Sequence, residues 1–201
     1  MTTAIIFDCE FLTSEGAPQR FWCGPHDPDP VIAQIGLVKL DLAAPGIAET
    51  ARLHVIPRGR DGTRAPLDPL FTRLTGVTEA VLDRDGRPLA EALAEVARFA
   101  GDARLWSWGK DEFNMIAISC YVEGLAPPLP VTRFSNACQL LLAAGMPYDD
   151  LKRTPSNKLA AYYGIEIAGR RDHDALGDAL SVAHVLLHHL REGRLTPAHF
   201  A

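Results

Sequence analysis

The sequence predicts an α/β protein whose mixed central sheet, of about five strands, carries helices on both faces. Three observations predict this class. Short apolar runs typical of strands come first along the chain. Segments with helical spacing then alternate with further strands. The 201 residues contain no internal repeat, low-complexity tract or linker, so we expect one domain spanning residues 1–201.

The predicted elements follow from local patterns. Residues 4–7 are apolar without interruption, which is typical of a strand covered on both faces. Residues 31–41 and 51–56 predict two further strands joined by a turn, and together the three predict a meander. We expect a loop over 57–69, helices over 70–75, 88–100, 110–125, 137–145, 157–164 and 174–190, and strands over 103–108 and 131–136.

Composition limits the function classes. Hydrophobic residues make up 47% of the chain and charged residues 22%, as in ordinary globular proteins. No apolar run approaches the ~20 residues of a membrane span, and residues 1–3 lead directly into the first strand without a basic segment. We therefore expect a cytoplasmic protein with no membrane partner. The net charge of −5 disfavours a protein that coats duplex nucleic acid, but not an enzyme that grips a short end through metal ions.

The four cysteines are scattered and favour reduced thiols over disulfides. Cys23 and His26 have the spacing of metal ligands, but a closed zinc site needs a second such pair.

Two carboxylates follow the first strand. Asp8 and Glu10 are two residues apart, so on a strand they point to the same side. Carboxylates held that close repel each other unless a proton or a cation lies between them. The alternative is a strand that simply ends in polar residues facing solvent, so the pair needs further ligands elsewhere in the chain.

The final predicted helix supplies one such ligand. Ala175, Val182 and Leu186 recur at helical spacing and mark the face that packs on the sheet. Asp178 lies beside this face, about one and a half turns after His173. A carboxylate in that position is costly unless it is paired.

Five short motifs, in this order and at these distances, give the chain a resemblance to a known family. They are "FDCE" (7–10), "QIG" (34–36), "LTGV" (74–77), "SWGKDE" (107–112) and "HDALGDA" (173–179). The chain resembles the DEDDh, or DnaQ-like, 3′–5′ exonucleases of the RNase H-like superfamily, and its exoribonuclease-like branches most. The resemblance runs from about residue 4 to residue 190. It implies the RNase H-like three-layer fold.

The resemblance also implies an activity and its cofactors. We expect a 3′–5′ exonuclease that acts on single-stranded RNA or DNA 3′ ends, RNA slightly favoured, and releases nucleoside 5′-monophosphates. Two divalent ions, Mg²⁺ or Mn²⁺, suit carboxylate ligands. Asp8 would bridge both ions, and Glu10 and Asp178 would complete the more tightly held one. His173 would be the general base.

The fourth carboxylate departs from the family pattern. The expected position holds Glu112, and Asp111 comes just before it. We favour Glu112, because it keeps the register, but either would serve. The same resemblance nominates substrate contacts, with Arg170 and Arg171 on the phosphate path: Phe11, Leu12, Leu74, Thr75, Gly76, Arg170 and Arg171.

Some alternatives stay open. One is a catalytically weak nucleic-acid-binding module of the same fold, and another is an endonuclease on a related fold. The insert at 13–29 offers Phe21 and Trp22 either as a flap over the site or as ordinary anchors on the core. The histidines of the last helix, 184, 188 and 189, are expected on its outward side. The resemblance further suggests a homodimer.

Overall fold

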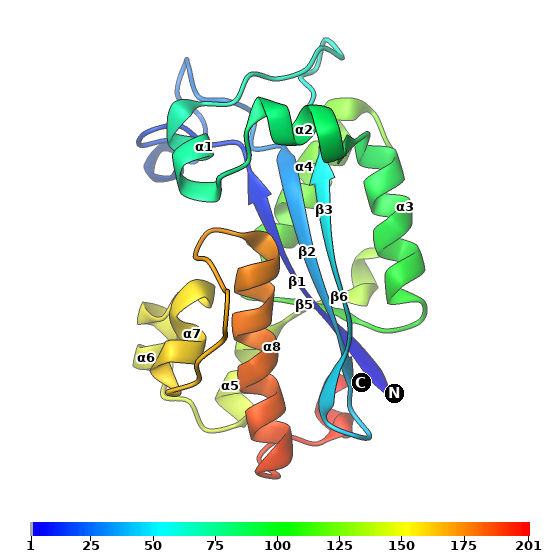
Figure 1. The fold of residues 1–201 in the computed structure, drawn as a ribbon, viewed down its shortest axis with the longest axis vertical. Coiled ribbons are helices and arrows are strands. Elements are labelled where there is room, and N and C mark those ends of the chain that lie inside the picture. The colour runs from blue at the N-terminus through cyan, green and yellow to red at the C-terminus, as the bar shows by residue number, and fades with distance from the viewer. Residues whose placement is uncertain (1) are drawn as a thin grey trace.

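The computed structural model describes residues 2–201, which form a mixed sheet in the order β4-β3-β2-β1-β5-β6 with helices packed around it (Figure 1). The strands are β1 Thr3–Phe11, β2 Ile32–Asp41, β3 Gly46–Val55, β4 Gly86–Arg87, β5 Leu105–Ser107 and β6 Phe134–Asn136. The helices are α1 Pro69–Thr75, α2 Glu79–Asp85, α3 Leu89–Ala100, α4 Asp111–Glu123, α5 Ala137–Ala143, α6 Tyr148–Arg153, α7 Ser156–Tyr162 and α8 Ala175–Arg191. The predicted α/β class with a mixed sheet is confirmed.

The sheet joins an antiparallel half to a parallel half. Strands β1, β2 and β3 pair antiparallel and form the predicted meander. Strand β5 runs parallel to β1, but it pairs only with Ile5 and Ile6. Within residues 2–201, the edge of β1 beyond Ile6 therefore has no strand beside it. This open edge is where β1 carries its two carboxylates.

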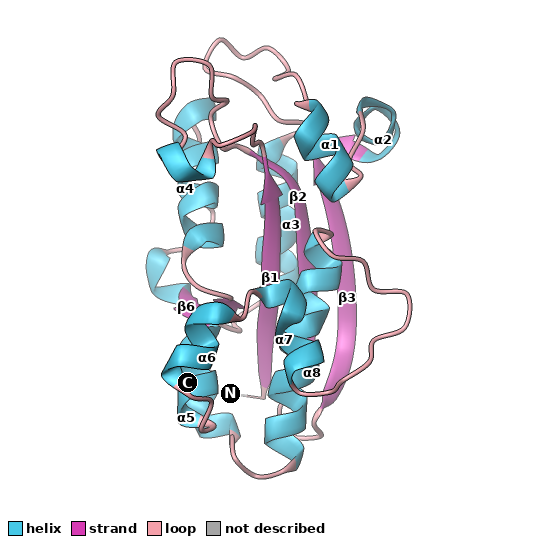
Figure 2. Ribbon diagram, turned by 90° about the vertical axis from the view of Figure 1, so that its left-hand side faces the viewer, coloured by secondary structure: helices cyan, strands magenta, loops and turns pink. Residues whose placement is uncertain are grey.

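Side chains of β1 alternate between two apolar layers. Ile6 faces a layer that contains the buried side of α8 together with α5 and α7. Phe7 faces the opposite layer, built on α3 and α4. Figure 1 shows α8 and α3 on opposite sides of the sheet, and Figure 2 shows the same molecule turned by 90°. The face predicted for the last helix is confirmed, since Ala175, Val182 and Leu186 are all buried.

Several short elements were not predicted. Helices α2 and α6 have seven and six residues, too few to show a repeating apolar pattern. Strand β4 has two residues and exists through its pairing with the end of β3. Strand β3 begins five residues earlier than predicted, because its exposed first half pairs with β2 without burying side chains. The sheet of residues 2–201 therefore has six strands, whereas we expected about five.

The prediction that all three histidines of the last helix face outward is wrong for His189. Its side chain is fully buried, with its ring centroid 4.9 Å from that of Tyr163. His184 and His188 are partly exposed. The sequence pattern missed this because Tyr163 lies directly after α7, and the packing of this segment on α8 is a tertiary contact.

Gly36 determines how closely α8 approaches the sheet. A Cβ atom at this position would lie 2.2 Å from the backbone of Ala175 and Leu176. Next to it, Gln34 accepts a hydrogen bond from the Ala175 N–H at 2.8 Å. The first turn of α8 is thus held directly on β2, opposite Asp8, which is paired with Gly36 in the strand register.

We expect Gly36→Ala to lower the free energy of unfolding by about 2–3 kcal/mol, because the added methyl group must displace backbone atoms of α8. The matched control is Gly46→Ala, where the nearest atom outside the neighbouring residues is 3.4 Å away. Urea unfolding of both variants gives the comparison. Equal stability of the two would contradict close contact between β2 and α8.

Two expectations from composition can be compared with the described chain. The four cysteines are all free thiols in the structure. Among residues 2–201, no helix has both the length and the apolar character needed to cross a membrane.

Candidate active site

Carboxylates from three elements meet at the open edge of β1. Asp8 and Glu10 come from the strand, and Asp178 comes from the first turn of α8. Oxygen atoms of Glu10 and Asp178 and a ring nitrogen of His173 all lie within 4.8 Å of one another. Asp8 and Asp178 are 6% and 5% exposed. Residues separated by more than 160 positions in the chain thus share one small volume.

The fourth carboxylate of this cluster is Glu112. It is the second residue of α4 and only 7% exposed, whereas Asp111 is exposed at the helix start. The Glu112 and Asp8 carboxyls are close enough for each to shift the pKa of the other. The structure therefore brings Glu112, rather than Asp111, to the strand carboxylates.

Burial and mutual repulsion make the charged forms of these acids costly. The pKa of Asp8 is raised well above its usual value by burial, then by the charges of Glu112, Glu10 and Asp178. Burial, followed by the charge of Asp178, raises the pKa of Glu10 to about 8. Burial also raises the pKa of Glu112 to about 7 and that of Asp178 to about 7. With four such groups together, the protein alone does not neutralise the cluster.

The donor set fits divalent cations. The Oε2 atom of Glu112 is buried and has no hydrogen-bond partner. Clustered carboxylate oxygens are the ligands that hard ions such as Mg²⁺ and Mn²⁺ prefer. A cation would also remove the repulsion that raises the pKa values. The residues present therefore suit the metal centre that the sequence motifs imply.

We expect the melting temperature in EDTA to fall as the pH rises from about 5 to about 8. Carboxyls such as Glu10 titrate near pH 4.5 when exposed but at about pH 8 in the folded protein. The folded state therefore binds more protons in this window, and stability is lost as those protons leave. Excess Mg²⁺ or Mn²⁺ should abolish most of the fall, because cations replace the protons.

Differential scanning fluorimetry across this pH range measures the effect. Glu10→Gln should make the profile less steep in EDTA, whereas Asp102→Asn, at an exposed acid in the turn before β5, should leave it unchanged. A profile with the same slope with and without metal would contradict cation binding by the cluster.

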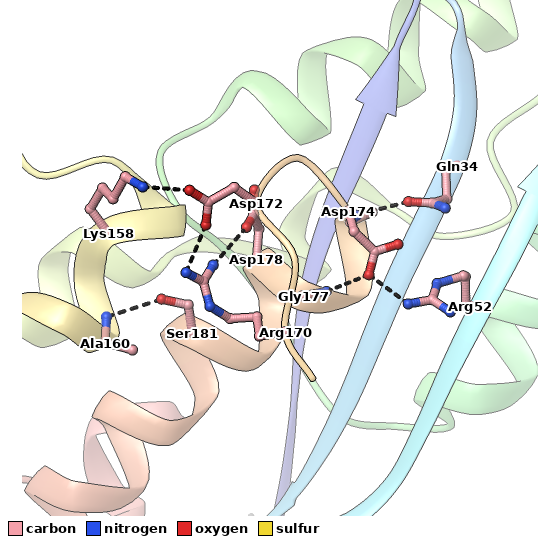
Figure 3. Close-up of polar contacts among 11 residues, drawn as sticks. Gln34, Arg52, Lys158, Ala160, Arg170, Asp172, Asp174, Gly177, Asp178 and Ser181 are labelled. Atoms are coloured by element: carbon pink, nitrogen blue, oxygen red, sulfur yellow. Dashed lines mark hydrogen bonds and ion pairs between the residues drawn. The ribbon is translucent and has the colours of Figure 1, made fainter. Parts of the chain in front are cut away.

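His173 lies at the mouth of the cluster, in the loop that enters α8. It is exposed and has a left-handed backbone with φ of 55°. The following residue, Asp174, begins the helix by accepting a hydrogen bond from the Gly177 N–H at 3.1 Å. Asp174 also pairs with Arg52 of β3, whose Nη2 lies 2.5 Å from its Oδ2 (Figure 3). These contacts hold the loop that carries His173 against the sheet.

A chain of ion pairs reaches Asp178 from α7. Figure 3 shows Lys158 paired with Asp172, Asp172 with Arg170, and Arg170 with Asp178. The Arg170–Asp172 and Arg170–Asp178 distances are 2.7 Å and 3.3 Å. Arg170 thus supplies a positive charge beside Asp178. Burial raises the pKa of Asp178, and the charge of Arg170 lowers it in part.

The structure separates the predicted substrate contacts into accessible and inaccessible side chains. Leu12 and Thr75 are 1% and 3% exposed, so their side chains are buried in the protein, and a substrate contact there would have to use the backbone. Leu12 packs with the α1–α2 layer, and Thr75 bonds its own helix. Leu74 is exposed, and Gly76 lies under the Arg171 side chain. Arg171 itself donates to the Thr75 carbonyl.

Phe11 lies on the face of β1 opposite Glu10. It packs with the α3–α4 layer and against Trp22, at a ring-centroid distance of 5.5 Å. Trp22 is half-buried, as expected for an anchor, while Phe21 is 82% exposed. Of the two residues, Trp22 therefore fits the interpretation as an anchor on the core, whereas the exposed Phe21 does not.

Solved structures have the same fold. The nuclease domain of 3′hExo, a DEDDh family member bound to rAMP, matches with a TM-score of 0.77 and 19% identity over 96% of this chain and 93% of that one. Cell-death related nuclease 4 matches with a TM-score of 0.70 and 19% identity, over 96% of this chain and 65% of that one. E. coli exonuclease I in complex with a dA16 oligonucleotide matches with a TM-score of 0.60 and 17% identity, over 93% and 40%.

No protein-family model and no curated protein sequence matches the chain. These matches establish the fold: the chain folds as the nuclease domain of 3′hExo, a DEDDh family member, and cell-death related nuclease 4 do. The most extensive of these three matches is with the 3′hExo nuclease domain, where the alignment covers nearly all of both chains.

Proposed function

We propose that this protein is a metal-dependent 3′–5′ exonuclease that hydrolyses phosphodiester bonds at single-stranded 3′ ends. The observation that carries the proposal is the meeting of four carboxylates and one exposed histidine at the open edge of β1. A binding module that had lost catalysis would have no need to keep four mutually repelling acids buried together. The fold of known 3′-exonucleases supports the same conclusion.

Each residue has a role that its position supports. Asp8 is close enough to Glu112, Glu10 and Asp178 for the charge of each to raise its pKa, so it would be the ligand that two cations share. Divalent ions bound there would activate water and stabilise charge on the leaving 3′ oxygen. His173, exposed at the mouth, would accept the water proton on a ring nitrogen. Asp174 and Arg52 keep the His173 loop in place.

Single-stranded ends, with RNA slightly favoured over DNA, are the proposed substrate class. Among the structural neighbours, one complex concerns 3′-end recognition of a histone mRNA stem-loop and another holds a dA16 oligonucleotide. The proposed products are nucleoside 5′-monophosphates, since attack at the terminal phosphodiester leaves the phosphate on the released nucleotide. Mg²⁺ or Mn²⁺ is the proposed cofactor pair.

Linear and circular oligonucleotides test the proposal. The protein is incubated with RNA and DNA, each as a 5′-labelled linear strand with a free 3′ hydroxyl and as an internally labelled closed circle, with Mg²⁺ or Mn²⁺. We expect a stepwise ladder from the linear strands, intact circles, and no reaction in EDTA. Cleaved circles would indicate an endonuclease, and bound but uncut linear strands would indicate a binding module.

A further inference from the structure

A groove adjoins the carboxylate cluster at the open edge of β1. It has a volume of about 700 Å³ and lies between the loop after β1 and one side of α4. Two of its lining residues adjoin the carboxylates in the chain: Phe11 directly follows Glu10, and Asp111 directly precedes Glu112. The groove is therefore bordered by the chain neighbours of two of the carboxylates, although it lies on the other face of β1.

The lining of this groove suits a nucleobase better than a phosphate. It is apolar and aromatic apart from two polar side chains, Asp111 and Asn114, and none of its described lining residues is a lysine or arginine: Phe11, Pro18, Phe21, Trp22, Pro30, Asp111, Asn114, Met115, Ala117 and Ile118. Aromatic faces bind bases by stacking, with little dependence on sequence. The exposed amide of Asn114 can pair with a base edge.

The loop presents Phe21 in a fixed position. Phe21 and Trp22 both have left-handed backbones, with φ of 54° and 53°, which cost energy in residues other than glycine. The Trp22 N–H bonds to the Ala17 carbonyl at 2.9 Å, and the Trp22 Nε1–H donates to the Leu12 carbonyl at 3.0 Å. The conformation is thereby held although it leaves the Phe21 ring in solvent.

An ion pair closes the same loop. The Arg20 guanidinium lies 2.6 Å from Asp27, and it also donates to the Glu15 carbonyl at 2.9 Å. Asp27 in turn accepts a hydrogen bond from the Gly24 N–H at 2.8 Å. A loop ordered in this way can hold an aromatic ring ready for stacking without the entropy cost of ordering it on binding.

We infer that the Phe21 ring is a stacking platform for a base of the substrate strand that lies two or more nucleotides on the 5′ side of the scissile bond. The inference rests on the proposed function, because it places a second protein contact on the nucleic-acid strand whose 3′ end lies at the carboxylates. The reacting nucleotide must lie at the carboxylates, on the other face of β1, so a base at Phe21 belongs to a nucleotide further along the strand. Phe21 then favours longer single strands over the shortest substrates.

The test compares substrate lengths in four proteins. Wild type, Phe21→Ala, Phe21→Trp and the control Tyr148→Ala are assayed on a dinucleotide and on a 12-nucleotide homopolymer with Mg²⁺. Tyr148 is a suitable control because it is 63% exposed and lies on α6, outside the groove. We expect Phe21→Ala to lower kcat/KM about tenfold on the 12-mer and to leave the dinucleotide unchanged. Phe21→Trp should keep wild-type values, and so should Tyr148→Ala.

Binding is measured separately by fluorescence anisotropy of the labelled 12-mer in EDTA, where no cleavage competes. We expect a comparable loss of affinity for Phe21→Ala alone. Equal effects on both lengths, or no effect on the 12-mer, would overturn the inference. So would a wild-type dimer that Phe21→Ala converts to monomers, since a second copy would then occupy the groove. If no protein shortens any strand, the proposed function fails, and the anisotropy result still decides the role of Phe21.

Discussion

We expect Asp8→Asn to lower the exonuclease rate by about a thousandfold, the largest effect of any substitution considered. Asp8 is the carboxylate on which the charges of Glu10, Glu112 and Asp178 all act. Replacing it with a neutral amide removes the ligand that two cations would share, and each cation contributes several kcal/mol of charge stabilisation in such sites. The same change removes repulsion, so the metal-free variant should melt at a higher temperature than wild type.

Rates on a labelled single strand and melting curves in EDTA measure these two effects together. Asp102→Asn is the control, because it removes an exposed acid in the turn before β5, outside the carboxylate cluster and the groove. It should leave both quantities near wild type. A less active Asp8→Asn that also melted at a lower temperature in EDTA would argue against repulsion among buried acids.

His173→Ala should lower kcat by about 10²- to 10³-fold through loss of the proton acceptor. The side chain is exposed, and histidine already bears the cost of a Cβ atom at this left-handed position, so replacement by alanine should lose little stability. The melting temperature with saturating Mn²⁺ should therefore stay close to that of wild type. If kcat falls while the rise in melting temperature with Mn²⁺ is unchanged, His173 acts in proton transfer and not in metal binding.

Single-turnover rates and Mn²⁺ titrations by calorimetry provide this separation. His26→Ala is the control, because it removes another exposed histidine from a loop. Unchanged single-turnover cleavage by His173→Ala would contradict the role of general base. Loss of Mn²⁺ binding with the loss of activity would instead make His173 a ligand.

The carboxylate pair of the first strand and the acid of the last helix could be predicted because each depends on a local pattern. Alternation along a strand places Asp8 and Glu10 on one side, and helical spacing places Asp178 beside a buried face. The structure brings these residues together with His173. The choice between Asp111 and Glu112 remained open because it depends on how α4 is rotated against the sheet, and only the packed helix fixes that angle.

What positions the site was harder to predict, because the contacts join distant segments. Gln34 and Gly36 are 139 or more positions before Ala175, the residue they help to dock. Arg52 holds Asp174 across 122 positions. Gly177 is required because a Cβ there would lie 2.5 Å from the Arg171 carbonyl oxygen. In the sequence, only Gly36 of "QIG" and Gly177 of "HDALGDA" could have indicated these contacts, since glycine often marks a close approach of two backbones.

The most direct test of the account is to locate bound metal. A crystal grown with Mn²⁺ should show anomalous scattering peaks for two ions about 4 Å apart, with Asp8 between them and Glu10, Asp178 and Glu112 as further ligands. The peaks should be absent from crystals of Asp8→Asn grown in the same way. Ordered Mn²⁺ elsewhere on the protein, with the four carboxylates free of it at saturating concentration, would contradict the central claim that these acids are buried together in order to hold cations.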